Sequence, residues 1–296
     1  MEKLFTGIYP PIITPFTADG NVDYEAIKFN IKKWNESELS GYIVLGSNGE
    51  YIYLDYEEKL KIIRLVVENA ADGKKVVAGT GCESTKETIK LSREAGVLGV
   101  NGVLVINPFY YGGAMTGSIL LNHYRQVADN IEVPLLLYNV PKFTGLNMDA
   151  GLVAQLSEHP NIVGIKDSTG NVAQLGEIIS QTGEDFNVLV GTASVLSSAI
   201  ALGAVGGILA LANIAPDHSV EIMKLVKAGK YEQARQLQLR MIPVNKVVTA
   251  TYGIAGLKCA LNHLGYRGGF PRLPLKPLDK EKEIALLDIL QKGGLL

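Results

Sequence analysis

Residues 161–170 read NIVGIKDSTG, an apolar run that ends abruptly at Lys166. The run is apolar throughout and does not alternate with polar residues, which is typical of a strand covered on both faces in a parallel sheet. Similar runs recur at a spacing of roughly 25–35 residues, each followed by a charged stretch with helical periodicity. The eight runs are residues 7–14, 41–45, 75–78, 102–106, 133–137, 161–165, 187–190 and 205–209.

Eight such units predict an α/β fold, a closed (β/α)8 TIM barrel. The alternative, an open doubly wound sheet, needs a phosphate-binding glycine turn after its first strand, and residues 15–17, Pro-Phe-Thr, cannot supply one. The residues after the eighth run are more than one barrel helix requires. We therefore predict a catalytic barrel over residues 1–225 and a C-terminal helical extension over residues 226–296 that packs on the barrel.

The composition excludes several classes of partner. With a formal net charge of −2 and no basic block, the chain lacks the positive field that nucleic-acid binding requires. Two cysteines, and an N-terminus without a basic or apolar signal segment, indicate a reducing, cytoplasmic setting. The uncharged stretch between Asp185 and Asp217 is long enough to cross a bilayer, but glycines interrupt it. A strand, a small-residue helix and another strand are predicted there, without a membrane contact.

Lys166 lies at the carboxyl end of its predicted strand, where barrel enzymes place their chemistry. A lysine with a pKa near 10.4 is neutral in about one molecule in 2,500 at pH 7, so a nucleophilic lysine needs a pKa of about 7–8. Burial in an apolar wall is the usual cause of such a shift. The alternative is a structural lysine that pairs with a carboxylate or reaches solvent, and from position alone this is the commoner case.

Few polar residues stand at the predicted strand ends, and they share a chemistry. They are Thr14, Ser47, Asn48, Glu50, Tyr110, Tyr111, Tyr138 and Lys166. A lysine with tyrosines and hydroxyls, and without a histidine or carboxylate cluster, suits carbonyl chemistry through an imine, with a serine relaying the proton of a tyrosine. The turn GSNGE, residues 46–50, is either an N-cap turn or a nest of backbone amides for a carboxylate.

No cofactor and no metal ion are predicted. Residues 79–81, Gly-Thr-Gly, lack the third glycine of a dinucleotide site and follow the wrong strand. The four histidines are widely spaced, and neither Cys82 nor Cys259 has a near partner in the sequence. A small-molecule substrate is the expected partner.

Four segments, in this order, resemble one family over essentially the whole chain. They are GSNGE at 46–50, YNVP at 138–141, GIKDS at 164–168 and GGI at 206–208. Together they look like the dihydrodipicolinate synthase and N-acetylneuraminate lyase family of Schiff-base (class I) aldolases. The resemblance implies a lyase that forms an imine between a lysine and pyruvate or another 2-oxo acid, without a metal.

The resemblance also implies a role for each matching residue. Lys166 would form the imine with C2 of the 2-oxo acid, and Tyr138 would be the general acid and base. The Ser47 hydroxyl would relay protons, while the Ser47 and Asn48 amides hold the pyruvate carboxylate. The remaining matches are the pocket carbonyl of Ile208, the substrate contact Ser168, and Tyr110. Tyr110 matches a tyrosine that such enzymes insert into a neighbouring subunit's site, so the resemblance implies a dimer or a dimer of dimers, a homotetramer.

The choice of the second substrate depends on two departures from the family pattern. Dihydrodipicolinate synthases usually carry paired threonines where this chain has Ser47 and Asn48, and an arginine where it has Phe143. A phenylalanine cannot offer a guanidinium to a distal carboxylate. Lys142 could compensate, but in an extended segment its side chain should point the other way.

Other segments look most like 4-hydroxy-2-oxoglutarate aldolase. They are residues 79–85, 159–164, 203–207, 252–254 and 256–258. The preferred prediction is therefore retro-aldol cleavage of 4-hydroxy-2-oxoglutarate, or a similar 4-hydroxy-2-oxo acid, to pyruvate and glyoxylate. The alternative is 4-hydroxy-tetrahydrodipicolinate (dihydrodipicolinate) synthase, which condenses pyruvate with aspartate semialdehyde in lysine biosynthesis. A third possibility, of another class, is a non-catalytic 2-oxo-acid-binding or regulatory barrel.

Overall fold

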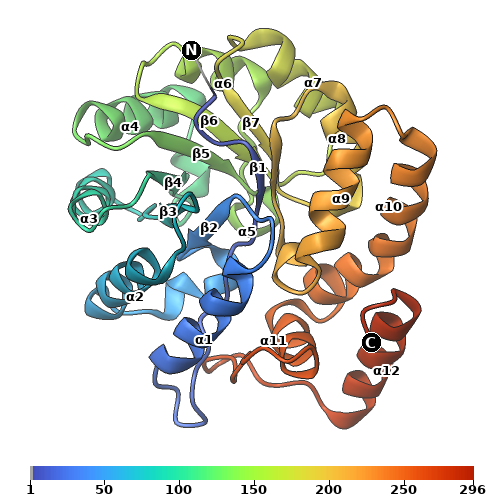
Figure 1. The fold of residues 1–296 in the computed structure, drawn as a ribbon. Coiled ribbons are helices and arrows are strands. Elements are labelled where there is room, and N and C mark those ends of the chain that lie inside the picture. Colours follow the sequence, from blue (N-terminus) through green and yellow to red (C-terminus); the bar gives the residue numbers. More distant parts are fainter. Residues whose placement is uncertain (1–2) are drawn as a thin grey trace.

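The computed structural model describes residues 3–296 and has eight parallel strands ringed by helices (Figure 1). The strands are β1 Gly7–Tyr9, β2 Gly41–Val44, β3 Lys75–Gly79, β4 Gly102–Ile106, β5 Leu135–Asn139, β6 Ile162–Asp167, β7 Asn187–Val190 and β8 Gly206–Ile208. They pair in the order β1-β8-β7-β6-β5-β4-β3-β2. A parallel bridge between Pro11 and Ile43 joins β1 to β2, so the predicted (β/α)8 barrel is confirmed.

The helices follow the strands in alternation and then continue beyond the barrel. They are α1 Tyr24–Asn35, α2 Tyr56–Asn69, α3 Thr85–Val97, α4 Gly117–Asp129, α5 Pro141–Thr144, α6 Ala150–Ser157, α7 Val172–Gln181, α8 Leu196–Leu202, α9 Pro216–Lys227, α10 Tyr231–Lys246, α11 Gly253–His263 and α12 Lys280–Lys292. Side-chain caps begin several of them: Asp55 and Glu58 form a capping box at α2, and Ser84 accepts from Glu87 N at α3.

Hydrophobic side chains form one cluster inside the barrel and another between the barrel and its helices. In β5, Leu136 and Tyr138 belong to the inner cluster, whereas Leu135 and Leu137 belong to the outer one. This alternation explains why the strands are apolar throughout, since both faces are buried. The backbones of β1 and β8 lie too close together for a side chain at Gly206, because a Cβ there would lie 1.9 Å from the carbonyl oxygen of Gly7.

The uncharged stretch between Asp185 and Asp217 forms β7, α8 and β8, as predicted. No helix within residues 3–296 is both long and apolar enough to cross a membrane. A cytoplasmic location stays a prediction.

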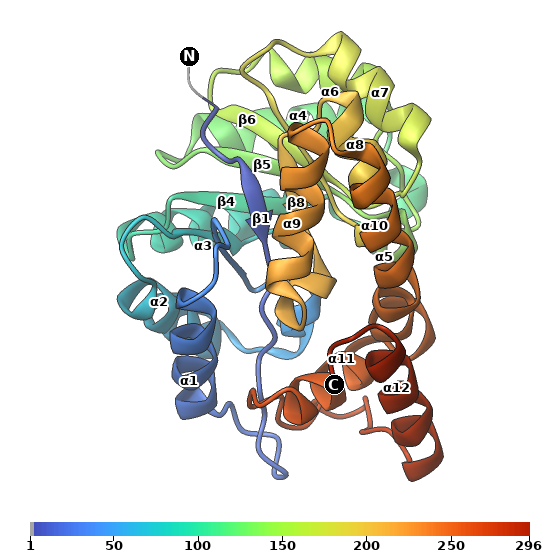
Figure 2. The ribbon, with the colours of Figure 1, turned by 45° about the vertical axis from the view of Figure 1, so that its right-hand side comes forward.

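The C-terminal extension runs along one flank of the barrel and continues past one of its ends (Figures 1 and 2). Helix α9 packs against β1 and α8, and α10 packs against α8 and α9 in turn. Helices α11 and α12 lie side by side at the end where β1 finishes (Figure 2). The predicted boundary between residues 225 and 226 falls in the last turn of α9, and the division into two parts stays a prediction.

Candidate active site

Lys166 and Tyr138 lie next to each other at the carboxyl ends of neighbouring strands. They are register partners in β6 and β5, so their side chains point to the same face, which is the barrel interior. Both are buried, and the Lys166 Nζ lies 4.1 Å from the centre of the Tyr138 ring. The barrel thus places an amine and a phenol together inside an apolar wall.

Ser47 joins this pair from the other side of the barrel. Its hydroxyl lies 3.2 Å from the Tyr138 hydroxyl, within hydrogen-bonding distance. Ser47 begins a short 3-10 helix, Ser47–Gly49, directly after β2. Three of the residues predicted from the sequence, from three different strand ends, therefore form one contiguous group of amine, phenol and hydroxyl.

The turn after β2 also presents backbone donors. As the first residues of a helical turn, Ser47 and Asn48 have amides without a partner inside that turn. The next two amides do have partners in the turn, since Gly49 N–H donates to the Gly46 carbonyl and Glu50 N–H donates to the Ser47 carbonyl. Amide pairs of this kind suit a carboxylate.

Tyr51 is a neighbour of this group that sequence reasoning missed. It begins the next 3-10 helix, Tyr51–Tyr53, and its ring packs against the inner cluster that contains Tyr138. The pKa of Tyr51 is raised above its ordinary value, mainly by burial and secondly by the nearby phenol of Tyr138. The only sequence signal for Tyr51 was its place directly after the GSNGE turn.

A buried polar network fixes the ends of β5 and β6 behind the reactive side chains. Asn139 and Asp167 are register partners, and the Asn139 amide donates to the Asp167 carboxylate at 2.9 Å. The Gln174 amide donates to the same oxygen at 3.0 Å. Because these side chains are locked, Tyr138 and Lys166 have little freedom to move apart.

Two other predicted binding residues, Ile208 and Ser168, are also buried or have a buried hydroxyl at strand ends. Ile208 ends β8 and belongs to the inner cluster together with Tyr138. Ser168 follows β6, where its hydroxyl is buried against Gly191 and has no hydrogen-bond partner in the part of the chain that the structure describes. An unpartnered buried hydroxyl is costly unless a ligand or water satisfies it.

Tyr110 lies outside this buried group. Its ring is 77% exposed and meets that of Tyr111 edge to face, with ring centres 5.1 Å apart. The Glu83 carboxylate accepts hydrogen bonds from the amides of Phe109 and Tyr110 at 3.1 and 2.9 Å, which holds the loop in place. Within one chain, therefore, the structure does not bring Tyr110 to Lys166.

Phe143 and Lys142 lie in the one-turn helix α5 and not in an extended segment. The Phe143 ring is 57% exposed. The Lys142 ammonium donates to the carbonyl oxygen of Thr249 at 3.0 Å, so it is tied to the C-terminal extension. Neither residue presents a guanidinium fork to the barrel mouth.

A buried ion pair joins the GSNGE turn, residues 46–50, to the C-terminal extension. The Nζ of Lys258, a residue of α11, lies 2.5 Å from the Oε1 of Glu50, and both side chains are only 1% exposed. The Lys258 ammonium also donates to the carbonyls of Thr14 and Phe270, each at 2.7 Å. Glu50, which adopts a left-handed conformation with φ 53°, also accepts from the Arg272 amide at 2.9 Å. Burial lowers the pKa of Lys258 to about 8, and Glu50 opposes this shift.

Replacing Lys258 with methionine is expected to destabilise the protein by roughly 3–5 kcal/mol, because the carboxylate of Glu50 would stay buried without its cation. Urea unfolding measures this loss as a lower midpoint at unchanged slope. The double variant Glu50→Gln/Lys258→Met is the control, and it should be more stable than Lys258→Met because neither charge remains. A single variant within about 1 kcal/mol of the wild type would contradict the expectation.

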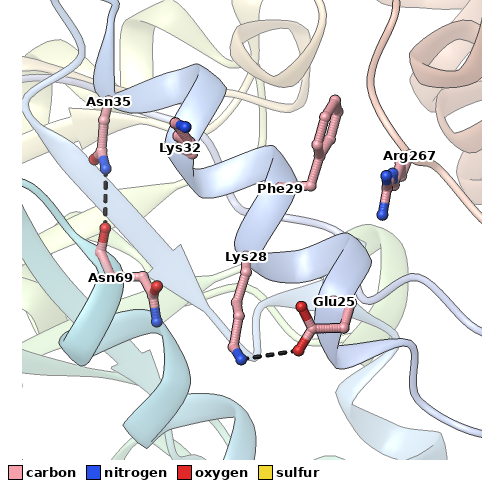
Figure 3. A pocket seen from close by; sticks show the side chains of 7 residues that line it. All are labelled: Glu25, Lys28, Phe29, Lys32, Asn35, Asn69 and Arg267. Atoms are coloured by element: carbon pink, nitrogen blue, oxygen red, sulfur yellow. Dashed lines mark hydrogen bonds and ion pairs between the residues drawn. The ribbon is translucent and has the colours of Figure 1, made fainter.

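A surface groove of about 420 Å³ lies elsewhere, along the outer side of α1 (Figure 3). Its lining residues are Glu25, Lys28, Phe29, Lys32, Asn35, Asn69 and Arg267. Lys28 is already paired with Glu25 at 2.8 Å. None of the predicted site residues lines this groove, so the chemistry of the side chains, and not the size of a hollow, locates the candidate active site.

Comparison with known proteins finds similarity over almost the whole chain. The model of the dihydrodipicolinate synthetase family matches residues 4–293. The 4-hydroxy-tetrahydrodipicolinate synthase of Methanothrix thermoacetophila is 37% identical over 290 residues, which cover 98% of this chain and 97% of that protein. A protein of the same name from Archaeoglobus fulgidus is 35% identical over 293 residues, 99% of this chain and 100% of the relative.

Solved structures show the same similarity in three dimensions. Dihydrodipicolinate synthase from Aquifex aeolicus superposes with a TM-score of 0.93 at 34% identity, covering 98% of this chain and 99% of that one. A structure described as the first monomeric dihydrodipicolinate synthase variant superposes with a TM-score of 0.94 at 30% identity, covering 99% and 98%.

Proposed function

The chain belongs to the dihydrodipicolinate synthetase family, and from this we propose that it condenses pyruvate with aspartate semialdehyde to 4-hydroxy-tetrahydrodipicolinate. It is an enzyme of the class I aldolase type, which forms a Schiff base between a lysine and pyruvate. The observation that supports the finer proposal is full-length similarity, at 35–37% identity, to relatives of that name. The comparisons therefore favour the second of the two activities predicted from the sequence. A non-catalytic barrel is the less supported reading.

In the proposed mechanism, the Lys166 amine attacks C2 of pyruvate, and water leaves to form an iminium ion. Loss of a proton from C3 then gives an enamine, because the iminium nitrogen accepts the electron pair. The enamine carbon attacks the aldehyde carbonyl and forms a carbon–carbon bond. Tyr138 is the proposed acid and base for these transfers, with Ser47 as the relay, because their hydroxyls lie 3.2 Å apart.

The pyruvate carboxylate is proposed to bind the amides of Ser47 and Asn48, which have no partner inside the turn after β2. Ile208 contributes its backbone carbonyl to the wall of the pocket. The buried, unpartnered hydroxyl of Ser168 is proposed to meet the substrate, which would supply the hydrogen bond that it lacks within the described chain.

A homo-oligomer is proposed as the working assembly, a dimer or a dimer of dimers. The exposed rings of Tyr110 and Tyr111 support it, since Tyr110 lies outside the buried group of its own chain and is proposed to serve the site of a neighbouring subunit. One relative is described as a monomeric variant, so the assembly has to be measured for this protein. Sedimentation at several concentrations, with Tyr110→Ala compared, measures it directly.

A second activity is supported by Phe143. The side chain at this position is an exposed aromatic ring, so it offers no cation to a distal carboxylate. This disfavours a carboxylate as far from the aldehyde carbon as that of aspartate semialdehyde. It favours glyoxylate, whose carboxylate is bonded directly to the aldehyde carbon, and with it the cleavage of 4-hydroxy-2-oxoglutarate. Ser47 and Asn48 also favour the cleavage activity, because dihydrodipicolinate synthases usually carry paired threonines at these two positions.

Two assays on one preparation separate these activities. One measures condensation of pyruvate with aspartate semialdehyde, and the other measures pyruvate released from a small panel of 4-hydroxy-2-oxo acids. The proposed function requires the first reaction to have the higher kcat/KM. A higher kcat/KM for 4-hydroxy-2-oxoglutarate would assign the chain to the aldolase activity instead.

Phe143→Arg is expected to raise the ratio of condensation with aspartate semialdehyde to that with glyoxylate by roughly tenfold, because a guanidinium can pair with the distal carboxylate. The matched control is Lys142→Arg, which places a guanidinium on the same short helix but at the side chain held by Thr249. The ratio should change in the first variant and not in the second. An unchanged ratio in Phe143→Arg would mean that other residues recognise the carboxylate.

A further inference from the structure

A cluster of three metal-ligating side chains lies outside the candidate active site, where α11 meets α12. It consists of Cys259, His263 and Glu283, whose ligand atoms all lie within 4.8 Å of one another. The described part of the chain holds no other group of this kind. None of the three side chains belongs to the group formed by Lys166, Tyr138 and Ser47.

The fold brings the three residues together from two helices. Cys259 and His263 are four residues apart in α11, so they share one face of that helix. Glu283 is in the first turn of α12, which packs against α11 (Figures 1 and 2). The His263 Nε2 and the Glu283 Oε1 are already 2.8 Å apart.

We propose that Cys259, His263 and Glu283 bind a divalent cation of borderline softness, with zinc as the best match. A thiolate and an imidazole select zinc-like ions, whereas calcium and magnesium prefer oxygen ligands alone. Zinc accepts sulfur at about 2.3 Å and nitrogen or oxygen at about 2.0–2.2 Å. Ligands of a tetrahedral zinc ion therefore lie roughly 3.3–3.7 Å apart, so small side-chain rotations would close this cluster around the ion.

Protons balance in the binding step. The cation takes the place of the proton between His263 Nε2 and Glu283, and the imidazole binds it as the Nδ1–H tautomer, so that proton is exchanged through solvent for one on Nδ1. The Cys259 thiol releases its proton to solvent as the sulfur–metal bond forms. The site would have three protein ligands, and water fills the fourth position because the His263 side chain is 35% exposed.

The surrounding charges include one that opposes a cation. The Lys280 Nζ lies 3.8 Å from Glu283, but this lysine is 82% exposed and its side chain can turn into solvent. Burial, with Glu283 adding to it, raises the pKa of the Cys259 thiol, and Lys280 acts against this shift. A bound cation would reverse the balance, because a coordinated thiol loses its proton.

A cation here would tie the last helix of the chain to α11. Helix α11 also carries Lys258, the residue before Cys259, and the ammonium of Lys258 pairs with Glu50, the last residue of the GSNGE turn. The ion would therefore stabilise the C-terminal extension at the place where it supports the active site.

Cobalt provides the test, because a cobalt–thiolate bond absorbs in the near ultraviolet and reports the sulfur ligand directly. The full chain is freed of metal with a chelator and titrated with Co²⁺ alone. One equivalent should produce the thiolate band, and added Zn²⁺ should remove it. Cys259→Ser should abolish the band, and His263→Gln or Glu283→Gln should weaken Co²⁺ binding by at least about tenfold.

Cys82→Ser is the matched control. Cys82 is also a half-buried free cysteine, but it belongs to no ligand cluster in the described residues. The band should persist in this variant. Zn²⁺ should raise the urea midpoint of the wild type and not that of Cys259→Ser, since a ligand stabilises only the state that binds it. Absence of the band in the wild type, its survival in Cys259→Ser, or its loss in Cys82→Ser would overturn the proposal.

Discussion

Lys166→Ala should abolish covalent trapping of pyruvate by borohydride and lower turnover by roughly 10⁴–10⁶-fold. Borohydride reduces an imine to a stable amine, so the wild type should gain the mass of one reduced pyruvate. The side chain at position 166 supplies the only buried amine that faces the barrel interior beside Tyr138 in the described residues. Without it, neither the imine nor the electron sink can form.

Lys258 makes this experiment specific, because it is a second buried lysine in the same protein. Its ammonium is already bound to Glu50 and to two backbone carbonyls, so it should not react with pyruvate. Peptide mapping should therefore find the adduct on Lys166 alone. Lys142→Ala, which removes a surface lysine near the barrel mouth, should still be trapped. An adduct that persists in Lys166→Ala, or full turnover in that variant, would exclude the proposed imine lysine.

Tyr138→Phe should keep pyruvate trapping but lose roughly 10²–10⁴-fold in turnover. The phenylalanine ring preserves the wall that lies 4.1 Å from the Lys166 Nζ, so the amine keeps its surroundings. The hydroxyl that reaches Ser47 is lost, and with it the proposed acid and base. Trapping and turnover should therefore separate, which a general loss of structure would not produce.

Tyr111→Phe is the matched control, since it removes a hydroxyl from an exposed ring outside the buried group. Its turnover should equal that of the wild type. Ser47→Ala should fall between the two, because Tyr138 would keep its hydroxyl but lose its relay partner. If Tyr138→Phe turned over as fast as the wild type, another group would have to move the proton.

Much of the fold was predictable because its signals are local. A strand buried on both faces is apolar along most of its length, so the runs at residues 102–106 and 161–165 identify parallel strands. The start of α3 has a local cause of the same kind, because the Ser84 hydroxyl accepts a hydrogen bond from the Glu87 amide three residues further on. In a parallel barrel all strands end at the same edge, so Tyr138 and Lys166 were expected to meet there.

Residues that depend on contacts distant in the chain were not predictable in this way. Lys258 carries no local sign that it pairs with Glu50, because α11 reaches the barrel only through the path of the C-terminal extension. Cys259 does have a near partner in the sequence, contrary to the expectation above, since His263 is four residues away, and Glu283 completes their cluster from another helix. Spacing along the chain could not show that the side chain of Glu283 lies beside them, because it comes from α12.

The sequence by itself determined the barrel, the order of its strands and the strand-end position of Lys166, because burial and capping act on neighbouring residues. Only the tertiary structure decided which polar groups share a space. It placed the Ser47 hydroxyl 3.2 Å from that of Tyr138, left Tyr110 exposed, and tied Lys142 to Thr249. These contacts join strand ends and helices that lie far apart in the chain, and packing of the whole barrel sets their distances.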